Sequence, residues 1–165
     1  MRCIKSVLIT ILFLSSIFAG CLSGTEEKHE IALVVKYEKT SGTIFESYVD
    51  GEHASTINVS LMFDFSNTTS SKNLVEFGVD PTDGRTPITV APNDNNTITV
   101  EFSNHGIYEI IAYAIDEQNK QENISIVIRI ELEIEWLESN TYEPKALPIN
   151  SIPNNDGPFP SSIIV

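Results

Sequence analysis

The stretch ISIVIRIELEIEW, residues 124–136, alternates apolar side chains with mostly polar ones. Successive side chains of a β-strand point to opposite faces of its sheet, so a period of two indicates a strand with one buried face. The apolar face would consist of Ile126, Ile128, Ile130, Leu132, Ile134 and Trp136. The polar face would carry Arg129, Glu131, Glu133 and Glu135, which would protect an exposed face or edge against unwanted strand pairing.

The same period recurs in shorter stretches before this one. It predicts strands over residues 31–37, 43–49, 56–65, 74–79, 88–90, 98–102 and 107–115. In residues 56–65 the inward side chains would be Ile57, Val59, Leu61, Phe63 and Phe65, and in residues 74–79 Val75 and Phe77 would share a face. Turn signals such as Asp50-Gly51 and DPTDG, residues 80–84, separate these stretches. Seven or eight strands without a helical period predict an all-β fold, an immunoglobulin-like antiparallel β-sandwich.

The stretch FSNHGIYEIIAYAIDEQNKQENISIVIRI, residues 102–130, resembles the last third of a polycystin-type (PKD) domain. That family is an immunoglobulin-like sandwich common in prokaryotic surface proteins. Its motif Gly-x-Tyr-x-Val-x-x-x-Val-x-Asp is matched here by Gly106, Tyr108, Ile110, Ala114 and Asp116. The resemblance implies that Gly106 lets the chain turn into the strand, that Tyr108 forms a tyrosine corner, and that Asp116 closes the next turn. The family's Trp-Asp-Phe-Gly-Asp-Gly run is missing, and the resemblance implies no enzymatic activity.

The first residues have the layout of an export signal. Arg2 and Lys5 precede an apolar stretch, residues 7–19, that is short for a bilayer-spanning helix. Phe18-Ala19-Gly20-Cys21 resembles the lipobox of prokaryotic lipoproteins, which implies cleavage between Gly20 and Cys21 and lipidation of the Cys21 sulfur. The alternatives are an ordinary signal peptide or an uncleaved anchor with a bystander cysteine. Loss of Cys3 with the signal would leave Cys21 without a disulfide partner, and acylation would remove this exposed thiol.

These signals divide the chain into four parts. Residues 1–20 would be a signal-peptide helix, 21–29 a short polar tether, 30–136 the sandwich, and 137–165 an extended tail or linker. Five of the eight prolines lie in this last part, and proline is excluded from central strands because it cannot donate a backbone hydrogen bond.

The charge balance limits the partners. Two of the ten basic residues lie in the signal, so the mature chain would carry eight of them against 23 acidic residues. Such a surface repels nucleic acid and anionic lipid headgroups, so the membrane would be reached through the N-terminal lipid alone. We therefore expect a lipid-anchored protein on the outer face of the membrane, in the cell envelope. Its non-catalytic module would serve adhesion, envelope structure or the binding of a protein or glycan partner, without a cofactor. The alternative is an accessory or binding subunit of an envelope transporter or secreted enzyme complex.

No catalytic motif stands out in the sequence. His29, His53 and His105 lack the spacing of metal ligands, and no nucleophile or phosphate-binding motif is present. The loop aspartates could hold calcium or simply form turns; they are Asp80, Asp83, Asp94 and Asp116.

Two further features point to surface sites. Four Asn-x-Ser/Thr sequons occur, of which Asn67 and Asn95 fall in expected loops and are the candidates for glycosylation. The strand over 107–115 has a second, apolar face besides the one expected to be buried. Either the proline-rich tail covers that face, or Ile111 and Tyr113 form a contact patch for a partner.

Overall fold

The computed structural model describes residues 30–139, 142–146 and 152, and in these residues every regular element is a β-strand. The chain divides into Met1–Glu30 and Ile31–Val165, so nearly all described residues belong to the second unit. The predicted all-β class is confirmed for the described residues. No helix in the described part is long and apolar enough to cross a membrane. The predicted signal helix, Gly20 and Cys21 lie outside the described residues.

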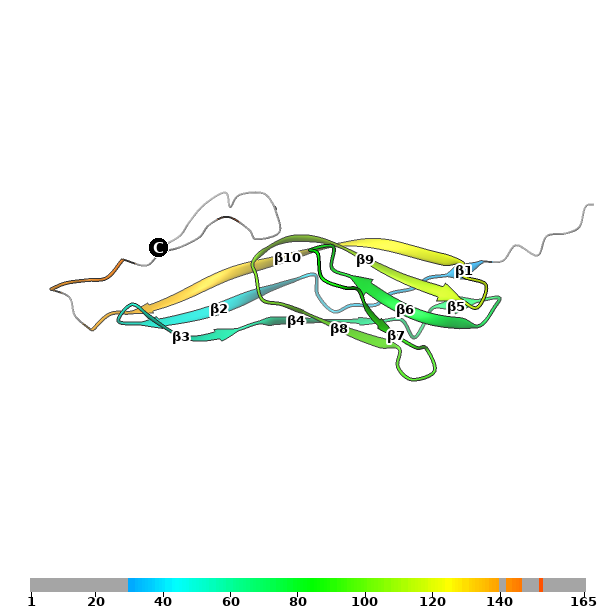
Figure 1. Cartoon of the computed structure of the whole chain (residues 1–165), viewed down its shortest axis with the longest axis horizontal. Helices are drawn as coiled ribbons and strands as arrows, with labels where there is room; N and C mark the ends of the chain where they lie inside the picture. The colour runs from blue at the N-terminus through cyan, green and yellow to red at the C-terminus, as the bar shows by residue number, and fades with distance from the viewer. Residues whose placement is uncertain (1–29, 140–141, 147–151, 153–165) are drawn as a thin grey trace, which may run out of the picture. The chain divides into compact units, whose positions relative to one another are not determined.

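Six strands form the largest sheet, in the order β3-β2-β10-β9-β6-β7 (Figure 1). Their bounds are β3 Glu52–Ile57, β2 Ser41–Val49, β10 Gln121–Leu137, β9 Gly106–Asp116, β6 Leu74–Asp80 and β7 Ile88–Val90. The first part of β10 pairs antiparallel with β9, from Gln121 to Ile130. Its second part pairs parallel with β2, from Arg129 to Leu137. The alternation in residues 124–136 therefore predicted the strand β10, which joins β2 and β9 within this sheet.

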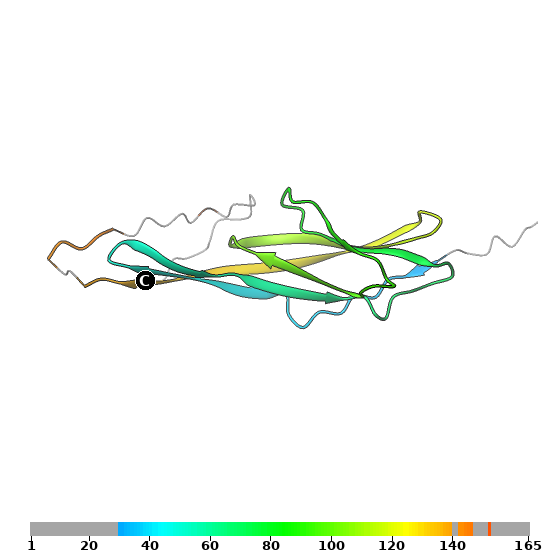
Figure 2. The same ribbon diagram turned by 60° about the horizontal axis from the view of Figure 1, so that its bottom comes forward.

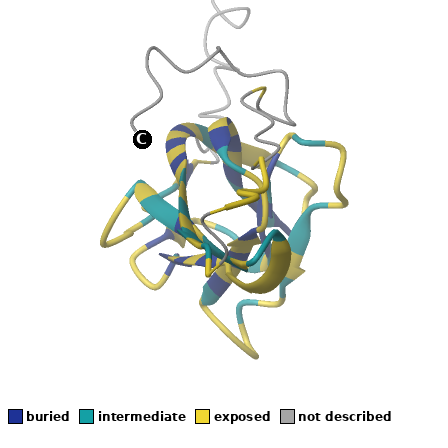
Figure 3. Cartoon of the chain, turned by 90° about the vertical axis from the view of Figure 1, so that its left-hand side faces the viewer, coloured by how far each residue is buried: buried dark blue, intermediate teal, exposed yellow. Residues whose placement is uncertain are grey.

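Two smaller sheets complete the described fold. Strand β4 (Val59–Asp64) pairs with β8 (Thr97–Phe102), and β1 (Ile31–Ala32) pairs with β5 (Thr69–Ser70). The inward side chains of β4 and β8 share one apolar core with those of β9, β10 and β6. The rings of Phe65, just after β4, and Phe77, on β6, stack with their centroids 4.9 Å apart. Figure 3 shows the buried positions in dark blue, alternating along the strands with exposed ones.

One expectation for residues 56–65 is wrong. Val59, Leu61, Phe63 and Phe65 are buried as predicted, but Ile57 is 64% exposed. The chain ends β3 at Ile57 and begins β4 two residues later, in a different sheet. The apolar alternation runs through this change of sheet without a break, so the pattern alone does not show it.

Two other strands differ from the predicted pattern. In residues 31–37 only Ile31–Ala32 form a strand, and Lys36 makes an isolated bridge to Asp64. In β6 the register shifts between Leu74 and Glu76, which leaves Val75 exposed while Phe77 is buried. A β-bulge of this kind breaks the strict alternation of faces.

The corner between β8 and β9 has the tyrosine contact that the resemblance implied. The Tyr108 hydroxyl donates a hydrogen bond to the backbone oxygen of Asn104, at 2.7 Å. Gly106 enters β9 with a φ of 152°, a conformation that L-residues with side chains rarely adopt. Burial is the main cause that raises the pKa of the Tyr108 hydroxyl above its ordinary value.

Asp116 closes the turn between β9 and β10. Its side chain is fully buried, and its Oδ1 atom accepts hydrogen bonds from the backbone nitrogens of Gln118 (2.9 Å) and Lys120 (3.1 Å). The backbone nitrogen of Asn119, which has a φ of 60°, donates to the Asp116 backbone oxygen. The turn-forming role expected for this residue is therefore confirmed.

We expect Asp116→Ala to lower the free energy of unfolding by about 2–3 kcal/mol, because two backbone donors lose a charged acceptor in a buried turn. Asp116→Asn is the matched control, since the amide keeps an oxygen at the Oδ1 position and can accept both hydrogen bonds. Urea unfolding of the three proteins measures the difference. Equal losses in the two variants would contradict the role of these acceptor bonds.

Candidate interaction surface

The strands β3, β2 and β10 continue beyond the rest of the fold as a three-stranded extension. We define it as residues 45–57 and 131–137, and its pairing runs from Glu133 opposite Phe45 to Leu137 opposite Val49. Strand β9 pairs with β10 only as far as Ile130, opposite Gly106. Figures 1 and 2 show the extension at one end of the described strands, beyond β4 and β8, with β1 at the other end.

Burial along the strands shows that the extension has no second layer among the described residues. Every residue of β3 is exposed. In β10 the inward side chains are buried at Ile126, Ile128 and Ile130, but only half-buried from Leu132 to Trp136. Leu132 still packs against the core, and beyond it both faces of the three-stranded sheet are open to solvent in the described part.

One face of the extension carries three rings, one on each strand. The Tyr48 ring on β2 lies 5.8 Å from Trp136 on β10 and 5.3 Å from His53 on β3, measured between ring centroids. The Tyr48 hydroxyl donates a hydrogen bond to the Glu46 carboxylate, at 3.1 Å. This hydrogen bond is the main cause that raises the pKa of Tyr48 above its ordinary value. The face thus combines aromatic rings with a carboxylate, a combination that attracts cations.

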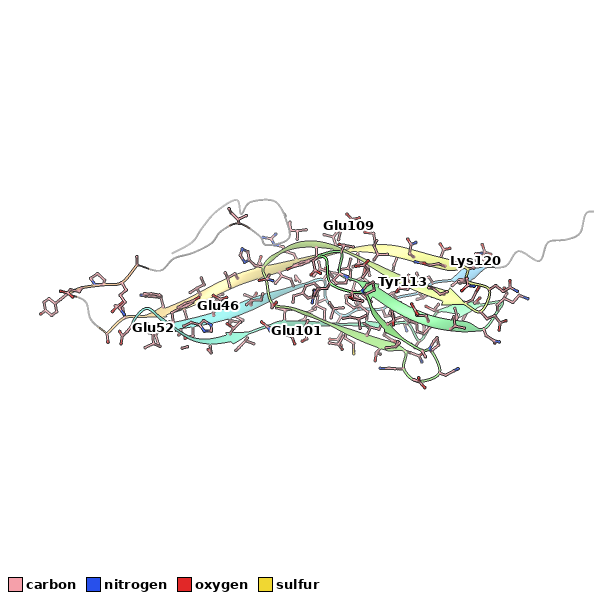
Figure 4. All side chains as sticks on the ribbon, in the orientation of Figure 1. Glu46, Glu52, Glu101, Glu109, Tyr113 and Lys120 are labelled. Carbon is pink, nitrogen blue, oxygen red and sulfur yellow. The ribbon has the colours of Figure 1, made fainter. Side chains whose placement is uncertain are left out.

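The other face of the extension combines acidic side chains with exposed apolar ones, which are Phe45, Val49, Ile57 and Leu137. Glu131, Glu133 and Glu135 of β10 are exposed on it, opposite Thr43, Phe45 and Ser47 of β2. The prediction that these glutamates lie on the outward face of the final strand is confirmed. The Ser47 hydroxyl is placed to donate to the Glu135 carboxylate, at 3.5 Å. Figure 4 labels Glu52, which lies on this face opposite Val49, and Glu46, which lies on the aromatic face.

Hydrogen bonds fix the end of the extension. Asp50 and Gly51 join β2 to β3 with φ angles of 51° and 85°, the left-handed pair that a two-residue type I′ turn requires. The Asp50 carboxylate accepts hydrogen bonds from the Ser139 hydroxyl (2.7 Å) and backbone nitrogen (2.6 Å), and these lower the pKa of Asp50. The Asp50 backbone nitrogen donates to the Leu137 oxygen, at 2.8 Å. These bonds hold the turn to the end of β10.

The predicted contact patch lies elsewhere, on the outer face of β9. Ile111 is 36% exposed, whereas Tyr113 packs its ring over Gly78 of β6 and donates to the Glu76 carboxylate at 3.2 Å. Burial, followed by the nearby Glu76 carboxylate, raises the pKa of Tyr113. Ile111 pairs with Ser125, which lies about 20 Å along β10 from Glu131, where the extension begins, at about 3.3 Å per residue. The predicted patch therefore lies on the same sheet but outside the extension, and a partner contact at Ile111 and Tyr113 stays a prediction. The alternative, cover by the tail, falls largely outside the described residues.

Other candidate residues also lie apart from the extension. Asn67 and Asn95 are exposed in turns, and the Asn95 side chain accepts hydrogen bonds from Thr97; their glycosylation stays a prediction. Asp83 forms an ion pair with Arg85 at 2.8 Å, and Asp80 accepts a hydrogen bond from the Thr82 backbone. Within the described ranges no group of three or more His, Cys, Asp or Glu side chains is placed to hold a metal ion.

The extension was not among the features predicted from the sequence. Two signals were present: the Asp50-Gly51 pair, which marks a tight hairpin, and the position of Trp136 near the end of the longest alternating stretch. Comparison of the chain with protein-family models matches no family, and comparison with curated proteins matches none of them.

Proposed function

We propose that this chain is an exported, lipid-anchored cell-surface protein whose immunoglobulin-like module binds a protein partner without catalysing a reaction. The observation that carries the proposal is the three-stranded extension, a sheet with exposed faces, a row of aromatic rings and an acidic surface. Extended surfaces of this kind suit strand addition and flat protein contacts.

The order of the strands supports the immunoglobulin-like class. The neighbours β10-β9-β6-β7 correspond to strands G, F, C and C′ of a variable-type immunoglobulin domain, and β4-β8 correspond to B and E. The hydrogen bond of Tyr108 to Asn104 falls at the start of the strand equivalent to F, where the tyrosine corner of this class occurs. Both observations agree with the resemblance of residues 102–130 to a PKD domain.

The lipid anchor rests on the sequence around Cys21 and gives the extension a role. The chain enters the described strands at β1, and the extension lies at their other end (Figure 1). A protein tethered through residues before β1 would present at the other end the surface that we propose for binding. The same surface would serve an accessory subunit of an envelope complex, and the identity of the partner distinguishes the two roles.

Site-specific photo-cross-linking in the native cell envelope tests this function. We expect a photoreactive residue in place of Ser55, exposed on β3, to give a discrete covalent adduct with one envelope protein. The matched control is the same residue in place of Thr99, exposed on β8 and outside the extension, which should give no such adduct. Equal cross-linking from both positions, or none from Ser55, would contradict a binding role for the extension. Mass spectrometry of the purified adduct would also show whether the chain begins with a diacylated Cys21.

A further inference from the structure

Among the residues that the structure describes, no strand covers the edge of β10 that faces away from β2 along the extension, and we call this the open edge. The Arg129 backbone nitrogen donates to the Thr40 oxygen, at 2.9 Å, and the Leu137 oxygen accepts from Asp50. Odd-numbered residues of β10 therefore direct their backbone groups toward β2, and even-numbered residues direct theirs to the opposite side. Up to Ile130 that side is occupied by β9. Beyond it, no strand of the described part pairs with β10 on that side, toward which Leu132, Ile134 and Trp136 direct their backbone groups.

The two faces beside this edge have opposite chemistry. On one face the side chains are Leu132, Ile134 and Trp136, all half-buried. On the other face three glutamates are exposed, of which Glu131 also forms an ion pair with Arg129, at 3.0 Å. A strand added at the edge would place alternate side chains beside each set, because its own side chains also alternate between faces. Its apolar residues would pack beside Trp136 and its neighbours, and basic residues would lie opposite Glu131, Glu133 and Glu135.

Charge decides which strand fits. The chain has a formal net charge of −13, and a second copy of β10 at this edge would bring its own glutamates against these ones. Like charges directly opposite each other on paired strands are destabilising, whereas opposite charges stabilise the pair. The glutamates therefore exclude self-association at this edge and select a cationic partner.

We propose that the open edge of β10, residues 131–137, binds an extended segment of a partner protein in which Lys or Arg alternates with apolar residues. This inference rests on the proposed function and names the partner's chemistry. The added strand would continue the position of β9, which begins at Gly106 opposite Ile130. Backbone hydrogen bonds to Leu132, Ile134 and Trp136 would supply affinity, and the alternating side chains would supply specificity.

A synthetic peptide with this pattern, acetyl-KVKVKVK-amide, is the probe. Trp136 is the only tryptophan of the chain, so its fluorescence reports on this edge without a label. We expect the peptide to bind the full chain and change the Trp136 emission. A peptide of the same composition, KKKVVVK, has the charge without the alternation and should bind at least about 10-fold more weakly.

Variants of the protein distinguish peptide binding at the open edge from attraction of the peptide by the overall negative charge. Glu131→Gln, Glu133→Gln and Glu135→Gln together should weaken KVKVKVK binding about 10-fold, from the loss of three cross-strand pairs. The matched control neutralises three exposed acids outside the extension, Glu38, Glu101 and Glu122, and changes net charge by the same amount. The control should bind the peptide nearly as tightly as the unaltered chain.

Hydrogen exchange separates strand addition from simple ion pairing. In the free chain the amides of Leu132, Ile134 and Trp136 should exchange rapidly, and KVKVKVK should slow them at least about 10-fold. Fast exchange in the presence of bound peptide would overturn the proposal, as would protection of these amides in the free chain, which would mean that the edge is already covered. Equal binding of KVKVKVK and KKKVVVK would also overturn it. If Ser55 still captured an envelope protein in that case, the proposed function would stand and only this partner chemistry would fail.

Discussion

Cys21→Ser is expected to move the protein from the membrane fraction into the medium. The lipobox-like residues before Cys21 imply that its sulfur carries the acyl chains, and serine has no sulfur to accept them. Each buried CH₂ group of a lipid contributes about 0.8 kcal/mol to membrane binding, so loss of the anchor has a large effect. Residues 21–165 are strongly acidic and would have no alternative attraction to anionic headgroups. Fractionation of cells followed by immunoblotting measures the change.

Cys3→Ser is the matched control, because Cys3 lies in the segment that we expect to be removed. This variant should remain in the membrane fraction. If the Cys21→Ser protein stays in the membrane with its N-terminus intact, residues 1–20 act as an anchor helix and the lipobox interpretation is wrong.

Phe63→Ala is expected to lower the free energy of unfolding by about 3–5 kcal/mol. Phe63 lies on β4 with an exposed fraction of 0%, in the core that β4 and β8 share with the six-stranded sheet. Removal of the ring would leave a cavity between the sheets. The expected loss is a large part of the free energy of unfolding of a typical folded protein, which is about 5–15 kcal/mol. Chemical unfolding monitored by Trp136 fluorescence measures it.

Met62→Ala is the control for this prediction. Met62 is the preceding residue on β4, but its side chain points to the other face and is 52% exposed. We expect a change within about 0.5 kcal/mol. Similar losses at Phe63 and Met62 would contradict the assigned faces of β4.

Alternation in the sequence predicted the strands whose one face meets the core. In β8 and β9, which the alternation predicted as strands, alternate apolar residues such as Val100 and Ile110 are buried. The alternation did not predict burial correctly where the burial of a residue depends on which sheet it joins. Ile57 continues the apolar alternation of β4, yet it lies on β3 opposite Phe45, on a face that no second layer covers among the described residues. The prediction that Val75 shares a face with Phe77 is wrong for a different reason. The register shift beside Val75 arises from the pairing of β6 with β9.

The acidic half of the candidate surface could be predicted, whereas the open edge could not. Glu131, Glu133 and Glu135 were expected on the outer face because they alternate with apolar residues. The edge exists because β9 begins at Gly106 and so reaches only Ile130 of a longer strand. Strand lengths and registers of this kind depend on pairing between distant segments, which a local pattern does not encode.

The parallel pairing of β2 with β10 has a consequence for how the protein folds. Ser47 and Glu135 lie on neighbouring strands although 88 residues separate them in the chain. Closing so long a loop is slow, and β2 has no neighbour on that side until β10 is present. In the export that we propose, the chain would emerge from its N-terminus, and the β2–β3 hairpin would gain β10 only when nearly the whole of the described chain has emerged. The surface that we propose for binding would therefore be completed last, so that only a fully delivered molecule would engage its partner.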